Sequence, residues 1–100
     1  MVTYEVKDSI LNINLLDRLD TNNAEESEKT INMARSANPG LHMVLNLDAL
    51  DYLSSAGLRI ILKLRKADDE LKIINVQPDV YDVFEMTGFT AMIPVEKKEK

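Results

Sequence analysis

The sequence contains no cysteine and a single histidine, His42. Without cysteine the chain cannot form disulfides or thiolate metal sites and has no thiol nucleophile, which fits a cytoplasmic protein. One imidazole cannot supply a histidine metal cluster or, within one chain, the usual serine–histidine–aspartate triad. We therefore expect no metal and no cofactor, and we interpret His42 as a structural residue.

The sequence also lacks a basic excess and a long apolar run. Its 17 acidic and 12 basic residues give a formal net charge of −5, whereas non-specific binding to nucleic acid or to an anionic membrane requires a basic surface. No apolar run approaches the roughly 20 residues that span a bilayer, and the first residues are strand-like rather than typical of a signal peptide. The expected protein is cytoplasmic and binds neither nucleic acid nor membrane.

What the sequence does contain is enough apolar patterning for one domain. The 100 residues fit a single core, which we assign to residues 1–95, with the charged residues 96–100 as a frayed tail. Apolar and polar residues alternate over residues 2–6 and 11–15, which predicts a β-hairpin with one buried face.

Strand and helix patterns alternate after this hairpin. A polar, turn-like segment at 17–23 leads into a predicted helix that begins at Ala24 and stops before Asn38; its thin apolar face comprises Ala24, Ile31, Met33 and Ala34. The later predicted elements are a buried strand at 41–47, a helix whose apolar face starts at Leu58, a strand at 71–76, a helix from Pro78 to Gly88, and a short strand or extended tail at 89–95. These patterns predict an α/β fold with a mixed sheet of four to five strands and about three helices.

The most informative stretch is residues 43–66, where a buried-strand pattern, a short acidic loop at 48–53 and an amphipathic helix follow one another. Ser54 and Ser55 lie between the loop and the helix, so they occupy a helix N-terminus. Unpaired backbone N–H donors and the positive end of the helix dipole gather there, and such a position tolerates a hydroxyl cap or a phosphate. We expect the functional site at this point.

Several residues near this point also have a purely structural interpretation. Ser54 is a favoured N-cap residue, and serine is common in the first turn of a helix, where Ser55 lies. Gly57 provides either close helix packing or clearance for a partner backbone. Arg59 either pairs with a partner carboxylate or is solvated.

An enzymatic alternative rests on Asp48 and Asp51, because paired carboxylates can serve acid–base chemistry or bind a hard cation. The sequence has no glycine-rich phosphate loop, no base adjacent to a serine nucleophile and no dense cluster of metal ligands. We therefore expect a protein that binds partners without catalysing a reaction.

Three local patterns resemble the STAS domain and, within it, the bacterial anti-sigma factor antagonists. Residues 18–24 are similar to the family's strand-to-helix loop, and residues 44–58 to its buried strand, acidic loop and Asp-Ser-Ser/Thr-Gly-Leu signature. Residues 83–89 are similar to the final helix of the family and its glycine-containing exit. The patterns occur in the family's order, and the order of elements agrees over nearly the whole chain.

The resemblance implies that the chain regulates transcription by partner switching. In the family, the unphosphorylated antagonist binds an anti-sigma factor that is also a serine kinase, which releases the sigma factor. Phosphorylation of the signature serine breaks the complex, and a serine phosphatase restores it. The target serine lies two residues before the signature glycine, which corresponds to Ser55. The implied partner surface comprises Asp20, Thr21, Asn22, Ser54, Ser55, Ala56, Gly57 and Arg59, of which the first three are, by sequence alone, turn and cap residues.

The chain departs from the family pattern at three positions. Ser54 replaces the signature Asp, Ala56 replaces the second Ser or Thr, and Asp17 replaces the loop Gly. The missing signature Asp keeps a second interpretation open, namely a phosphorylation-independent STAS scaffold or a subunit of a stress or lipid-transport complex. In either case we expect the free chain to be a monomer that exposes one helix end.

Overall fold

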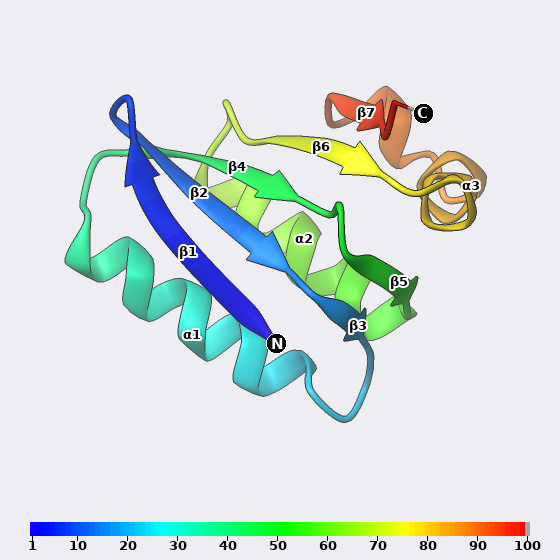
Figure 1. Ribbon diagram of the computed structural model, residues 1–100, viewed down its shortest axis with the longest axis horizontal. Coiled ribbons are helices and arrows are strands. Elements are labelled where there is room, and N and C mark those ends of the chain that lie inside the picture. The colour runs from blue at the N-terminus through cyan, green and yellow to red at the C-terminus, as the bar shows by residue number, and fades with distance from the viewer. Residues whose placement is uncertain (100) are drawn as a thin grey trace.

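The computed structural model describes residues 1–99. Strands and helices alternate after an N-terminal hairpin (Figure 1). In chain order the elements are β1 (Val2–Lys7), β2 (Ile10–Leu15), β3 (Asp17–Leu19), α1 (Ala24–Ala37), β4 (His42–Asn46), β5 (Leu50–Leu53), α2 (Ser55–Ala67), β6 (Lys72–Val76), α3 (Pro78–Met86), the 3₁₀ helix η1 (Phe89–Ala91) and β7 (Val95–Lys97).

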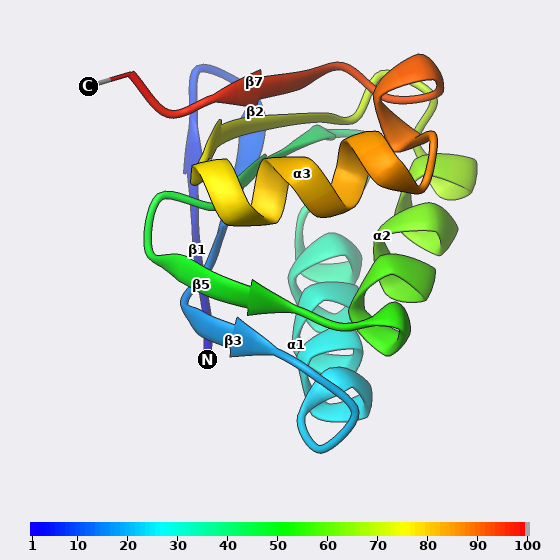
Figure 2. The same cartoon turned by 90° about the vertical axis from the view of Figure 1, so that its right-hand side faces the viewer.

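The main sheet has five strands in the order β1-β2-β4-β6-β7. β1 and β2 are antiparallel, and the other neighbouring strands are parallel. Helices α1 and α2 cover one face of this sheet, whereas α3 lies beyond the end toward which β4 and β6 run (Figures 1 and 2). The predicted α/β fold with a mixed sheet and three helices is thus confirmed.

The hydrophobic core lies between the main sheet and helices α1 and α2. β2 contributes Leu11, Ile13 and Leu15, which alternate with less buried asparagines. Ile31 from α1 and Ile61 from α2 enter the same buried cluster. Full burial of each such side chain contributes roughly 1.5–3 kcal/mol to folding, so this core anchors both helices to the sheet.

The predicted hairpin is confirmed, but the inner face of its first strand is only partly covered. Tyr4 and Val6 lie opposite the buried Ile13 and Leu11, yet they remain 46% and 48% exposed. β1 is the outermost strand of the sheet. Its side chains therefore have a neighbouring strand on one side only.

The apolar face predicted for α1 was wrong at Met33, whose side chain is 64% exposed. The buried positions of α1 are Ala24, Ser27, Ile31 and Ala34, which follow one another at intervals of three or four residues. This spacing defines a single narrow stripe along the helix. Met33 falls outside that stripe, and the small Ser27 occupies the buried position instead.

Two short strands occur where the sequence predicted a turn and a connecting loop. β3 and β5 pair in parallel as a separate two-stranded sheet, with Leu19 beside Leu53. Strands of three and four residues are too short to show a reliable alternation of apolar side chains. Tertiary pairing, rather than local sequence pattern, therefore determines these strands.

The C-terminal part also differs from the prediction. Residues 89–91 form η1, and only Val95 of the predicted final segment lies in a strand, β7. Glu96 and Lys97, predicted to belong to a frayed tail, continue β7, and the N–H of Lys98 donates to the carbonyl of Val76. Pairing with β6 holds Glu96 and Lys97 in a strand, and the pattern of charges alone could not indicate this pairing. The final residue of the predicted tail lies outside the described residues.

Candidate functional site

The end of β3 and the beginning of α2 meet at one end of the molecule. Leu19 pairs with Leu53, and the N–H of Ser54 donates to the carbonyl of Leu19 over 3.0 Å. Figure 2 shows β3 and β5 side by side, with α2 starting directly after β5. The structure thus brings the polar loop after Leu19 next to the two serines.

Ser54 is the N-cap of α2, as the sequence predicts. Its backbone is extended, with φ −92° and ψ 174°, and its Oγ accepts a hydrogen bond from the N–H of Gly57 at 3.3 Å. Its carbonyl accepts the first helical hydrogen bond, from Leu58, at 3.0 Å. Ser54 therefore fixes the residue at which α2 begins.

Ser55 is the first residue of α2, and its side chain is exposed. The first turn of α2 contains no acidic residue, while Arg65 and Lys66 lie in the last turn. The hydroxyl of Ser55 consequently sits at the positive end of a helix dipole that no carboxylate within the first turn of α2 offsets. A helix N-terminus favours negative charge near its N–H groups.

Gly57 is buried beneath this helix start. A Cβ atom at this position would lie 2.7 Å from Leu53 Cδ1, 2.9 Å from Leu19 Cγ and 3.0 Å from the carbonyl oxygen of Leu19. Of the two interpretations of this glycine, the structure supports close packing. Gly57 therefore packs against Leu19 and Leu53 at the start of α2, within the implied partner surface.

Asp20 organises the loop beside the serines. Its Oδ1 accepts hydrogen bonds from the N–H groups of Asn22 and Asn23 at 3.0 and 3.2 Å, and its Oδ2 accepts one from Arg18 Nε at 2.7 Å. Partial burial raises the pKa of Asp20, but these hydrogen bonds outweigh it, so the pKa lies below its ordinary value. Asp20 is thus a charged turn residue, while Thr21 and Asn22 are exposed beside it.

Arg18 and Tyr52 add a surface that the prediction did not include. They are paired across β3 and β5, and the guanidinium carbon of Arg18 lies 4.8 Å from the centre of the Tyr52 ring. Both side chains are about half exposed. Arginine and tyrosine are common binding hot spots, but recognising this pair required the β3–β5 pairing, which the sequence pattern did not reveal.

The remaining predicted residues lie on the first turns of α2. Ala56 is half-buried against the core, and Arg59 is exposed. Within residues 1–99 the described ion pairs do not involve Arg59. Its guanidinium is therefore accessible to a carboxylate of another molecule.

Asp48 and Asp51, the pair that motivated an enzymatic alternative, have structural contacts. Gln77 Nε2 donates to the carbonyl of Asp48 at 3.0 Å and to Asp51 Oδ1 at 3.1 Å. The carboxylate of Asp48 also pairs with Lys98 Nζ at 3.2 Å. These contacts connect the β4–β5 loop to the start of α3 and to the chain after β7. In the described part of the chain, no group of three or more His, Asp or Glu side chains is placed to hold a metal ion.

Comparison with known proteins agrees with this geometry. The family model of the STAS domain matches residues 1–100. The chain belongs to the STAS domain family. This STAS domain is 36% identical over 99 residues to BtrV of Bordetella bronchiseptica, which is described by its name as an anti-sigma factor antagonist. The alignment covers 94% of this chain and 84% of BtrV. That similarity places the chain among the anti-sigma factor antagonists.

Solved structures share the fold of this STAS domain. An anti-sigma factor antagonist from Mycobacterium paratuberculosis superposes with a TM-score of 0.85 at 19% identity, over 96% of this chain and 84% of that one. The phosphorylated form of the Bacillus cell fate determinant SpoIIAA superposes with a TM-score of 0.70 at 19% identity, over 95% of this chain and 90% of that one. Among residues 1–99, the STAS domain has no helix with the length and hydropathy needed to cross a membrane.

Proposed function

We propose that this STAS domain works by partner switching at Ser55. The unphosphorylated chain binds an anti-sigma factor that is also a serine kinase, phosphorylation of Ser55 releases that partner, and a serine phosphatase resets the cycle. The observation that carries the proposal is the exposed Ser55 hydroxyl at the N-terminus of α2, whose first turn has no acidic residue, beside the loop that contains Asp20. The chain acts as a binding protein in the cytoplasm and not as an enzyme.

The electrostatics of the site support a switch that leaves the fold intact. A phosphoserine adds about −1.5 to −2 charges near neutral pH. Within the STAS domain this charge faces helix N–H donors and the positive dipole end of α2. A partner that packs closely against the same helix end, or that presents its own carboxylates there, is repelled.

The partner surface follows from the residues that surround Ser55. The exposed side chains of Thr21, Asn22 and Arg59 lie on the loop and on the first turns of α2. Ser54 takes over helix capping from the Asp of the family signature, so the helix start is preserved without that carboxylate. Asp20 holds the loop in shape through its backbone contacts.

The proposal is tested by affinity purification from native cell lysate with wild type, Ser55→Ala and Ser55→Asp as baits. We expect wild type and Ser55→Ala to retain a kinase-like anti-sigma factor and Ser55→Asp to lose it. Ser36→Asp is a matched control, because Ser36 is an exposed serine on α1; it should bind as wild type does. Phosphosite mapping of recovered wild type should identify Ser55.

Two outcomes of this experiment would contradict partner switching. If all baits recover the same complex without a kinase and Ser55 carries no phosphate, the chain is a phosphorylation-independent scaffold. If Ser55→Ala remains fully phosphorylated by the recovered kinase, the switch residue lies elsewhere.

A further inference from the structure

The two edges of the main sheet differ in how well they are protected. β7 has three residues and an irregular register with β6, and lysines lie at its end. Short, irregular, lysine-bearing edges resist pairing with other chains. β1 has six residues, contains no proline, and pairs with β2 in an unbroken register from Val2 to Lys7. β1 is therefore the edge that is open to a further strand.

Alternate backbone groups of β1 point out of the sheet. Met1 and Leu16 exchange backbone hydrogen bonds of 2.9 and 3.3 Å, which assigns the hydrogen-bonded pairs of the hairpin to the odd-numbered residues of the first strand. The N–H and C=O groups of Val2, Tyr4 and Val6 consequently face the open edge. Within residues 1–99 no strand pairs with that edge.

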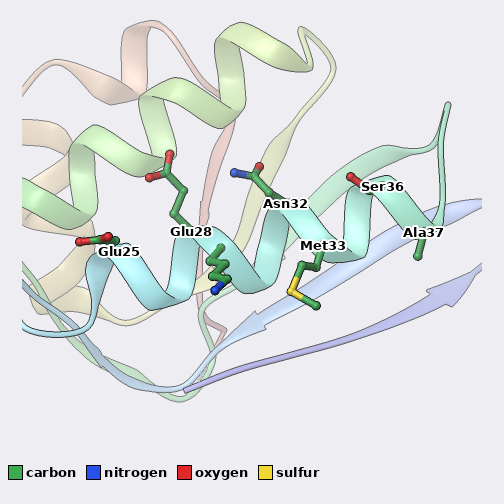
Figure 3. A pocket seen from close by; sticks show the side chains of 7 residues that line it. Glu25, Glu28, Asn32, Met33, Ser36 and Ala37 are labelled. Carbon is green, nitrogen blue, oxygen red and sulfur yellow. The ribbon is translucent and has the colours of Figure 1, made fainter.

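Two apolar side chains of β1 are exposed along the same edge, and one on α1 is exposed on the side of the sheet that this helix covers. Tyr4 and Val6 are 46% and 48% exposed on the core side of the sheet, and Met33 of α1 is 64% exposed. Figure 3 shows Met33 projecting from α1 on the side of the helix along which β1 and β2 run. Large apolar side chains next to unpaired strand groups are the features that another strand would cover.

The geometry points to a second copy of this chain as the occupant of this edge, with the two β1 strands antiparallel about a two-fold axis at Tyr4. Outward backbone groups at even positions require an even residue to pair with an even residue, which the Tyr4-centred register satisfies. In this register Val2 lies opposite Val6 of the second copy. The apolar faces of both sheets then lie on the same side and form one continuous row.

Charge distinguishes this register from its neighbour. Centring the axis on Glu5 would place the two Glu5 carboxylates opposite each other, which is unfavourable. Centring it on Tyr4 places each Glu5 opposite Thr3 of the second copy. The β1 sequence carries one acidic and one basic residue, so the two paired strands together carry no net charge.

The dimer does not depend on the proposed function. Ser54 and Ser55 follow β5, which belongs to the separate two-stranded sheet and not to the β1 edge. The dimer contacts drawn from β1 therefore do not include the start of α2. The inference replaces the expectation that the free chain is a monomer.

Disulfide cross-linking tests the register, and the absence of native cysteine makes single-cysteine variants unambiguous. Hydrogen-bonded antiparallel partners have Cα atoms about 5.5 Å apart, which a disulfide can bridge. We expect Tyr4→Cys to form a covalent dimer under mild oxidation. Val6→Cys is the matched control, because four residues of offset separate the two copies of position 6 by about 13 Å. Equal cross-linking of both variants, or none in Tyr4→Cys, would overturn the inference.

Sedimentation equilibrium of Val6→Pro tests the edge independently. The N–H of Val6 faces outward, so proline in both copies removes two symmetry-related hydrogen bonds from the dimer and none from the β1–β2 pair. We expect wild type and Val6→Thr to dimerise, and Val6→Pro to do so at least about tenfold more weakly. If circular dichroism shows that Val6→Pro does not fold, Tyr4→Lys replaces it as the dimer-weakening variant, because it places two like charges at the two-fold axis. A monomeric wild type, or variants that dimerise as wild type does, would refute pairing at this edge.

Discussion

Gly57 determines how closely the start of α2 approaches β3 and β5. The missing side chain lets the helix rest directly on Leu19 and Leu53, where a Cβ atom would meet a backbone carbonyl at 3.0 Å. A carbonyl oxygen in a paired strand cannot move as readily as the end of a side chain. The signature glycine thus positions Ser55 through packing.

Substituting Gly57 tests this role. Alanine favours a helix by about 1 kcal/mol over glycine, but overpacking at such a contact costs about 1–3 kcal/mol. We expect Gly57→Ala to lower the free energy of unfolding by about 1 kcal/mol in urea titrations and to weaken partner binding. A variant as stable as wild type, or more stable, would show that the helix start has room for a methyl group.

The backbone at Asp17 has a conformation that favours glycine. Its φ is +68°, in the left-handed region, and it stands at a register irregularity between β3 and β5. Glycine adopts this region without a steric penalty, whereas β-branched residues do so poorly.

Asp17→Gly should therefore keep or raise the free energy of unfolding, by up to about 1 kcal/mol, and Asp17→Val should lower it by about 1–2 kcal/mol. Arg18→Gly provides the contrast, because Arg18 lies in the same strand without a positive φ; that change should destabilise. Chemical denaturation of the three variants measures the difference. If Asp17→Gly is less stable than wild type, the contacts of the Asp17 side chain stabilise the fold by more than its left-handed backbone conformation destabilises it.

At the scale of elements, the sequence predicted those whose pattern is local. Two helices could be placed from local pattern alone. α2 was indicated by Ser54 followed by an apolar face, and α3 by Pro78 followed by Val80 and Phe84. β3 and β5 were missed because Leu19 and Leu53 acquire strand pairing from each other across the fold. The Arg18–Tyr52 contact was missed for the same reason, since it exists only when those strands are paired.

A second contact between elements connects the start of β4 with the loop after α2. His42 Nδ1 lies 2.7 Å from Asp68 Oδ1, and its Nε2 lies 3.0 Å from Glu70 Oε2. The hydrogen bond to Asp68 raises the pKa of His42, reinforced by the nearby carboxylates and opposed by partial burial. Burial raises the pKa of Asp68. Hydrogen bonds from Met43, His42 and Glu70 lower that pKa by more than burial raises it, so the net shift is downward.

These shifts predict how stability depends on pH. The His42 contribution is fully present below its ordinary pKa of about 6.5 and is lost as pH rises through the raised value. The Asp68 contribution is present above about pH 4 and is lost as pH falls through the lowered value. We expect the urea midpoint of wild type to fall between about pH 6 and pH 8, and that of His42→Gln to fall less. Parallel profiles for both proteins would contradict a stabilising role for the charged imidazole.

At the scale of the whole molecule, three regions are separated. The helix start at Ser55 and the loop at Asp20 lie together through β3 and β5, the His42–Asp68 contact lies where β4 begins, and the open edge belongs to β1. Ser55 therefore follows a strand of the two-stranded sheet and belongs to neither the main sheet nor its edge. In the proposed switch, phosphate at Ser55 is therefore expected to alter binding while the core remains folded.

The most direct test is calorimetric titration of the recovered anti-sigma factor with unphosphorylated chain and with chain carrying phosphoserine at position 55. Like charges brought together in an interface cost several kcal/mol, so the predicted loss of affinity is about a hundredfold or more. Thermal unfolding of the two forms, measured in parallel, should differ by only a few degrees. Equal affinity of the two forms, or loss of the folded state on phosphorylation, would contradict the account.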